Sequence, residues 1–255
     1  LSLIGVLFAV AFFNNAALRD YNNQFDEIIF STPLSKGAYF FGRFLGAWVL
    51  ALIPLIGVYI GVSLGAWMAP IFDWVPAERF GPTPWEAYFN SFLILALPNM
   101  LFSGSLIFGL AQKWRSTIVS FVGALLIIIG YSISGALLSD IENVDLAALA
   151  DPFGIRTYSV EMRYATTVEK NEEAIGFSAR MVQNRALWAS VSIAVLLLGF
   201  WSFSPQKNPS RRKLKKVKAD EDSQTAVISK PRVIQVFEGT FGSQFLSFFK
   251  DAFRS

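Results

Sequence analysis

The sequence predicts an all-α membrane protein that crosses the bilayer several times. Three observations lead to this prediction: 53% of the 255 side chains are hydrophobic, only 16% are charged, and the charges lie between long apolar runs. A soluble chain has about 25% charged residues. The sequence has no His and no Cys, which excludes disulfides, thiolate or imidazole metal sites, and Ser-His or Cys-His catalysis. We therefore expect a protein that is not an enzyme and that itself binds no metal or cofactor.

Five charge-free runs are long enough, or nearly so, to cross a bilayer as helices, which takes about 20 apolar residues. They cover residues 1–18, 44–72, 87–112, 116–139 and 186–206. Because the chain starts inside the first of these runs, we expect it to be a fragment of a longer protein. No run contains an ionisable side chain, which argues against a proton relay and against a membrane enzyme.

The distribution of Lys and Arg predicts which ends of the spans face the cytoplasm. If the five spans alternate in direction, one side carries 16 Lys and Arg and the other carries 6. The side with more positive charge is normally cytoplasmic. This rule places Arg19, Lys113 and Lys213 inside and Asp73 and Glu161 outside. The seven Trp residues lie near the ends of spans, as expected for interfacial anchors.

The cytoplasmic segment that joins the first two spans, residues 19–43, predicts a short amphipathic helix. At 100° per residue its apolar side chains share one face, formed by Tyr21, Phe25, Ile28 and Ile29. Asp26 and Glu27 point away from that face, and Pro33 ends the helix and turns the chain. Taken alone, these residues favour a helix that marks the membrane surface, with docking to another protein as the alternative.

Small residues repeat along the second span at Gly57, Gly61 and Gly65. This spacing lets another helix approach closely. The neighbour is either a helix of the same bundle, which we favour, or a second chain. Pro54 and Pro98 should bend the second and third spans because each removes a helix hydrogen bond.

The long outer loop, residues 139–186, predicts a small helical cap outside the membrane. Thr166 and Glu169 have the spacing of a capping box. Charged residues of this region are expected to form exposed ion pairs of little energetic value: Asp151, Arg156, Arg163 and Arg185.

The C-terminal part predicts a basic and then disordered linker over residues 205–235. Seven Lys and Arg lie between positions 207 and 218, where they should attract anionic lipid rather than nucleic acid. Five Phe then share one helical face and predict an amphipathic interfacial helix over residues 236–255, which leads to a downstream segment: Phe237, Phe241, Phe245, Phe248 and Phe249.

We call the segment between the first two spans, residues 19–43, the elbow. The sequence FDEIIFSTPLSKGAYFFGRFLGA, residues 25–47, begins within it and resembles the transmembrane subunit of type-2 ABC exporters. Three later stretches resemble a bacterial subgroup whose longer members continue into a second permease half and a zinc aminopeptidase domain. These stretches are DPFG at 151–154, YATTVEKN at 164–171 and NRALW at 184–188. The resemblance extends over most of residues 1–204.

The resemblance implies a permease of a bacterial inner membrane, with six spans in the full unit and pairing with a second permease half or a second copy. Residues 20–36 would be a coupling helix that docks on a separate ATPase subunit. Its anchors would be Phe25, Ile28 and Ile29, beside Tyr21, and its polar rim Asp26, Glu27 and Lys36. ATP and Mg²⁺ would bind to the partner, because the sequence has no G-x-x-x-x-G-K-[ST] loop. The alternative is a membrane scaffold or assembly protein that does not transport.

Overall fold

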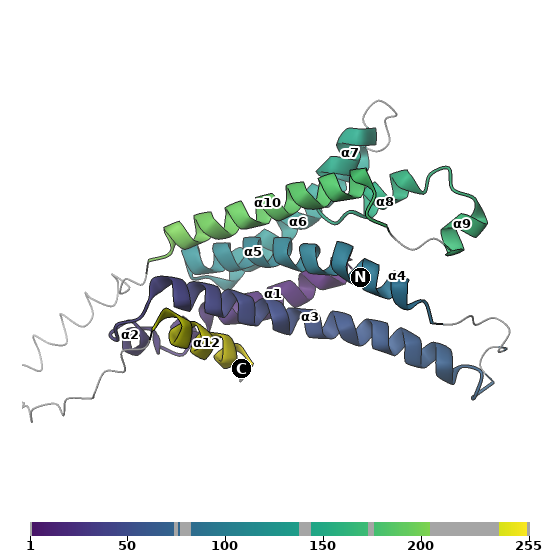
Figure 1. Ribbon diagram of the computed structural model, residues 1–255. Coiled ribbons are helices and arrows are strands. Elements are labelled where there is room, and N and C mark those ends of the chain that lie inside the picture. The colour runs from purple at the N-terminus through teal and green to yellow at the C-terminus, as the bar shows by residue number, and fades with distance from the viewer. Residues whose placement is uncertain are drawn as a thin grey trace, which may run out of the picture.

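The computed structural model describes residues 2–73, 76, 83–137, 144–172, 176–204 and 240–253. Every regular element in these ranges is a helix, which confirms the all-α prediction. Figure 1 shows the long helices side by side in one elongated bundle. They are α1 (Ser2–Asn22), α3 (Lys36–Met68), α5 (Leu97–Trp114), α6 (Thr117–Leu137) and α10 (Ala179–Ser202).

Four helical stretches are long and apolar enough to cross a membrane, and each overlaps a predicted span. They are Lys36–Met68, Trp85–Trp114, Thr117–Ala136 and Ala179–Ser202. The predicted first span is helical as α1, but it is not one of the four. Two asparagines interrupt its apolar run, and Arg19 and Asp20 end it. The count of five spans is therefore not confirmed, whereas the membrane character of the chain is supported.

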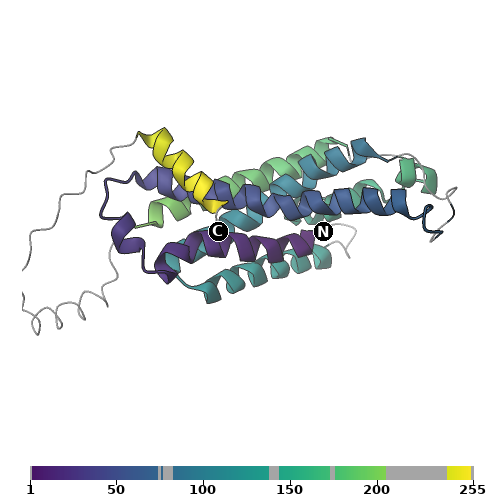
Figure 2. The ribbon, with the colours of Figure 1, turned by 90° about the horizontal axis from the view of Figure 1, so that it is seen from below.

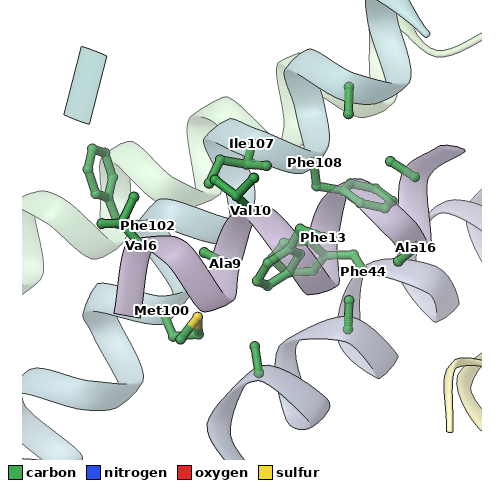
Figure 3. Packing of buried hydrophobic residues seen from close by; sticks show 14 of the residues in the cluster. Val6, Ala9, Val10, Phe13, Ala16, Phe44, Met100, Phe102, Ile107 and Phe108 are labelled. Atoms are coloured by element: carbon green, nitrogen blue, oxygen red, sulfur yellow. The ribbon is translucent and has the colours of Figure 1, made fainter. Parts of the chain in front are cut away.

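The core of the bundle forms around α1, which packs against α3, α5 and α6. Its buried side chains recur at helical spacing and point toward α3 and α5 (Figure 3): Val6, Ala9, Val10, Phe13 and Ala16. The Phe13 ring lies 5.3 Å from that of Phe44, measured between centroids. It also fills the space beside Gly104, where a Cβ atom would come within 2.2 Å of the ring. The close packing of α1 against α5 thus depends on a large side chain, Phe13, that faces a glycine, Gly104.

The apolar stretch Trp85–Trp114 contains an irregular turn. It consists of α4 (Trp85–Ser91), the π-helical turn η2 (Phe92–Ala96) and α5. Pro98 lies just after η2, at the start of α5, and has no N–H to continue the regular hydrogen-bond pattern. The missing donor lies beside a π-helical turn, a feature frequent at functional sites, and the predicted bend at Pro98 stays a prediction.

The two ends of the bundle carry different short helices. At one end lie α7 (Val144–Ala150), α8 (Ile155–Glu161) and α9 (Thr167–Glu172) (Figure 1). These helices lie in the segment for which a helical cap is predicted, and its position outside the membrane stays a prediction. The capping box also forms: the Thr166 N–H donates to the Glu169 carboxylate at 2.6 Å, and the Glu169 N–H donates to Thr166 Oγ1 at 3.3 Å.

At the opposite end lie α2 (Asp26–Ile29) and α12 (Phe241–Ala252), which crosses α3 (Figure 2). The predicted helix over 236–255 is thus present in its described part as α12. Phe237 and the predicted linker at 205–235 lie outside the described residues.

Candidate functional site

The elbow between α1 and α3 is not one continuous helix as the periodicity predicts. Helix α1 runs to Asn22, the backbone turns at Gln24 with φ +62°, and α2 adds a single turn. A left-handed φ at a non-glycine residue cannot continue an α-helix. The predicted end of the elbow helix is confirmed, because the hydroxyls of Ser31 and Thr32 donate to the last carbonyls, at 2.7 and 2.6 Å.

The predicted docking residues divide into an outward and an inward group. Phe25 and Ile28 are 54% and 64% exposed, which leaves two large apolar side chains on the surface of the elbow. Tyr21 and Ile29 instead pack against the core.

The three charged residues predicted for the polar rim also occupy different environments. Asp26 is buried and Glu27 is half-buried. Lys36 lies at the start of α3, with its Nζ 4.6 Å from the centroid of the Phe200 ring on α10. The surface that a partner can contact directly is therefore smaller than predicted and is centred on Phe25 and Ile28.

A buried ion pair, which the sequence analysis missed, joins the end of α1 to α3, and the Phe25 N–H at the elbow donates to the Asp20 carbonyl at 2.9 Å. Arg43 Nη2 lies 2.6 and 2.7 Å from the two carboxylate oxygens of Asp20, and both side chains are at most 5% exposed. The Tyr39 hydroxyl donates to the same carboxylate at 2.8 Å. Charge-assisted contacts of this kind hold their partners in a defined geometry, so the elbow is mounted on α3 through a rigid link.

Helix α12 packs closely across the same region of α3, at two glycines. A Cβ atom at Gly42 would lie 2.9 Å from Phe248 Cβ, and one at Gly46 would lie 2.4 Å from Ala252 Cβ. Asp251 of α12 adds a second carboxylate 3.4 Å from Arg43. The spacing of Gly42 and Gly46 is a small-xxx-small pattern, and this signal in the sequence could have identified the contact.

A groove lies between the elbow and α12. It has a volume of about 290 Å³, and its lining combines apolar and charged side chains from α1, α2, α3 and α12. Phe25 and Ile28 form part of its wall on the elbow side, and Phe248 and Asp251 belong to its α12 side. A concave site with an apolar centre and charged neighbours can receive a protruding side chain of another protein.

The DPFG and NRALW stretches meet at the opposite end of the bundle. Asn184 donates to the carbonyls of Ala148 and Asp151, at 2.6 and 3.0 Å. Arg185 donates to Asn99 Oδ1 at 2.8 Å. Gly154 has φ +75°, and a Cβ atom there would lie 2.7 Å from the Arg185 guanidinium. The two stretches thus join the outer cap to α5 and α10.

Asp151 caps α8 instead of forming the predicted ion pairs. Its carboxylate accepts hydrogen bonds from the backbone N–H groups of Phe153 and Arg156, at 2.8 and 2.6 Å. Burial raises the pKa of Asp151, and these two hydrogen bonds partly oppose that rise. Within the described ranges, the ion pairs of the cap region consist of the exposed Arg180–Asp145 contact at 2.7 Å.

The glycine stripe on α3 has no neighbour within the described part of the chain. A Cβ atom at Gly57, Gly61 or Gly65 would meet no other atom within 4 Å. The buried residues of α3 end at Leu55, so the stripe belongs to its unburied half. Packing within the bundle, which we favoured, is therefore not found among the described residues.

Neither the arrangement of possible metal ligands nor comparison with known proteins assigns a function to this chain. Among the described residues, no group of three His, Cys, Asp or Glu side chains is arranged to hold a metal ion. Comparisons with protein-family models, with curated proteins and with solved structures gave no match. The geometry of the elbow is accordingly the basis for assigning a function.

Proposed function

We propose that this chain is the transmembrane permease subunit of an ATP-driven, ABC-type exporter in a bacterial inner membrane. A separate nucleotide-binding subunit would bind ATP and Mg²⁺ and dock on the elbow. One observation carries the proposal: Phe25 and Ile28 are exposed on a short elbow that the buried Asp20–Arg43 pair fixes to the bundle. Large apolar side chains on a rigid support are typical anchors of protein interfaces.

The elbow is also well placed to transmit a movement. It links α1 and α3 directly, and the Asp20–Arg43 pair ties the end of α1 to the start of α3. A partner that displaces the elbow would therefore move both helices together. Pro54 interrupts the hydrogen bonding inside α3, so the outer half of α3 can change direction relative to its inner half.

The unpartnered glycine stripe supports pairing with a second permease half or a second copy. The outer half of α3 exposes Gly57, Gly61 and Gly65 without a described neighbour. A small-residue face in a membrane helix is suited to close contact with another helix. Such pairing would place two elbows, one from each half, against two ATPase subunits.

The proposal is tested with the double variant Phe25→Ala, Ile28→Ala in the full chain. Its matched control is Phe177→Ala, Leu146→Ala, which removes two comparably exposed apolar side chains at the opposite end of the bundle. The tagged protein is purified from mild detergent extracts of native membranes, and co-purifying ATPase is measured by photolabelling with azido-ATP.

We expect the elbow variant to lose about tenfold or more of the labelled partner, because each truncated anchor typically costs about 1 kcal/mol or more. The control should keep it, and both variants should insert normally. Equal recovery of labelled ATPase with both variants would contradict the proposal.

A further inference from the structure

Helices α5 and α10 cross at a pair of glycines and leave a groove beside the crossing. A Cβ atom at Gly199 would lie 3.2 Å from the Gly109 Cα, so the backbones are nearly in contact there. The groove has a volume of about 450 Å³. Its walls are mostly apolar and include Leu106 and Leu110 of α5 and Val195 and Leu198 of α10.

The mouth of this groove carries one cation and two indoles. Lys113, Trp114 and Trp201 all line it, and the two Trp side chains are 53% and 71% exposed. The Lys113 Nζ lies 4.6 Å from the centroid of the Trp114 ring. Among the residues that the structure describes, no carboxylate lines the groove, and Lys113 gives this lining a positive charge.

We propose that this groove binds one anionic phospholipid. Both helices belong to stretches that are long and apolar enough to cross a membrane, so the groove opens toward lipid. An acyl chain would lie along the apolar walls, and the phosphate would bind the Lys113 ammonium and an indole N–H. Basic pockets between membrane helices bind acidic head groups in this way, and Trp prefers the depth of the head groups.

The charge at the mouth favours a lipid over another apolar helix. An entirely apolar helix in the groove would desolvate the Lys113 ammonium without offering it a negative partner, which is costly in a membrane. A phosphate neutralises the ammonium while the acyl chain fills the walls. This site lies on α5 and α10 and does not depend on docking of an ATPase to the elbow.

The test is native mass spectrometry of the detergent-solubilised full chain, titrated with phosphatidylglycerol or phosphatidylcholine of identical acyl chains. We expect one phosphatidylglycerol to bind in preference to phosphatidylcholine. Lys113→Gln should lower the affinity for phosphatidylglycerol by about fivefold. Lys250→Gln is the control, because it removes a positive charge that is also exposed but lies on α12 and does not line the groove.

A second variant tests the apolar part of the site. Val195→Trp narrows the groove and should reduce binding of both lipids at this site, while the unfolding temperature confirms that the protein stays folded. Equal affinity for the two lipids in the unmodified protein would overturn the proposal. So would equal effects of Lys113→Gln and Lys250→Gln, or full lipid binding by a folded Val195→Trp protein.

Discussion

Removing one partner of the Asp20–Arg43 pair should destabilise the whole bundle. In the variant Asp20→Asn, Arg43 keeps its charge in a site where its side chain is 2% exposed, and Asp251, at 3.4 Å and 42% exposed, compensates only partly. Breaking a buried pair from one side typically costs about 3 kcal/mol or more. For a chain of this size, a loss of about 3 kcal/mol lowers the unfolding temperature by about 6–12 °C.

The Arg180–Asp145 pair provides a control with nearly the same geometry and a different environment. Its nitrogen and oxygen are 2.7 Å apart, but its side chains are 41% and 79% exposed. An exposed pair contributes about 1 kcal/mol or less, so Asp145→Asn should lower the unfolding temperature by only a few degrees. Replacing Asp20 with Leu and Arg43 with Met together should recover much of the loss, because no unpaired charge then remains buried.

The assay is thermal unfolding in detergent, followed by Trp fluorescence, on proteins purified in parallel. Burial controls the energetics of the pair if Asp20→Asn lowers the unfolding temperature far more than Asp145→Asn does. Equal shifts for the two single variants would refute this reasoning, as would a double variant less stable than Asp20→Asn.

Three further predictions concern α12, the topology and the cap. Gly46→Leu should displace α12 from α3, because even a Cβ atom has no room there, whereas Gly61→Leu should leave that contact intact; cross-linking of engineered cysteines across the interface distinguishes the two outcomes. A single Cys in place of Glu161 should react with an impermeant maleimide in intact cells, because this position is predicted to lie outside. Labelling only after lysis would contradict the predicted topology. Hydrogen bonds from Thr166 lower the pKa of Glu169. The ionised carboxylate therefore stabilises α9 fully at a pH above the usual carboxyl pKa, and this stabilisation is lost as the pH falls through the lowered pKa of Glu169. Hydrogen exchange in α9 should show this pH dependence, corrected for intrinsic exchange, in the unmodified protein and not in Glu169→Gln.

Local patterns in the sequence predicted the features that depend on neighbouring residues. Charge-free runs identified the four long apolar helices, and the spacing of Thr166 and Glu169 identified the capping box. Ser31 and Thr32 end α2 as their preference for capping and turns implies. Each of these features depends on residues that are close together in the sequence, so periodicity and motif rules can predict it.

Contacts between residues far apart in the sequence were not predicted. The sequence analysis gave Arg43 no partner, but its side chain is buried against Asp20, 23 residues earlier. Gly42 and Gly46 received no role, although α12 packs on them after an interval of about 200 residues.

The elbow residues show the same limit. Helical periodicity placed Ile29 with Phe25 and Ile28, but Ile29 packs against the core while the other two side chains are exposed. A pattern within one segment cannot reveal which of its faces the rest of the chain will cover.

Photo-cross-linking from position 25 tests directly whether the elbow docks on an ATPase. A benzophenone attached to a single Cys at this position reports what the exposed side chain touches in native membranes, and the absence of native cysteines makes the attachment specific. A probe at Phe177 is the control. We expect the probe at position 25, and not the probe at position 177, to cross-link a protein that azido-ATP also labels. Cross-links from position 25 to lipid alone, or to proteins that azido-ATP does not label, would contradict this expectation.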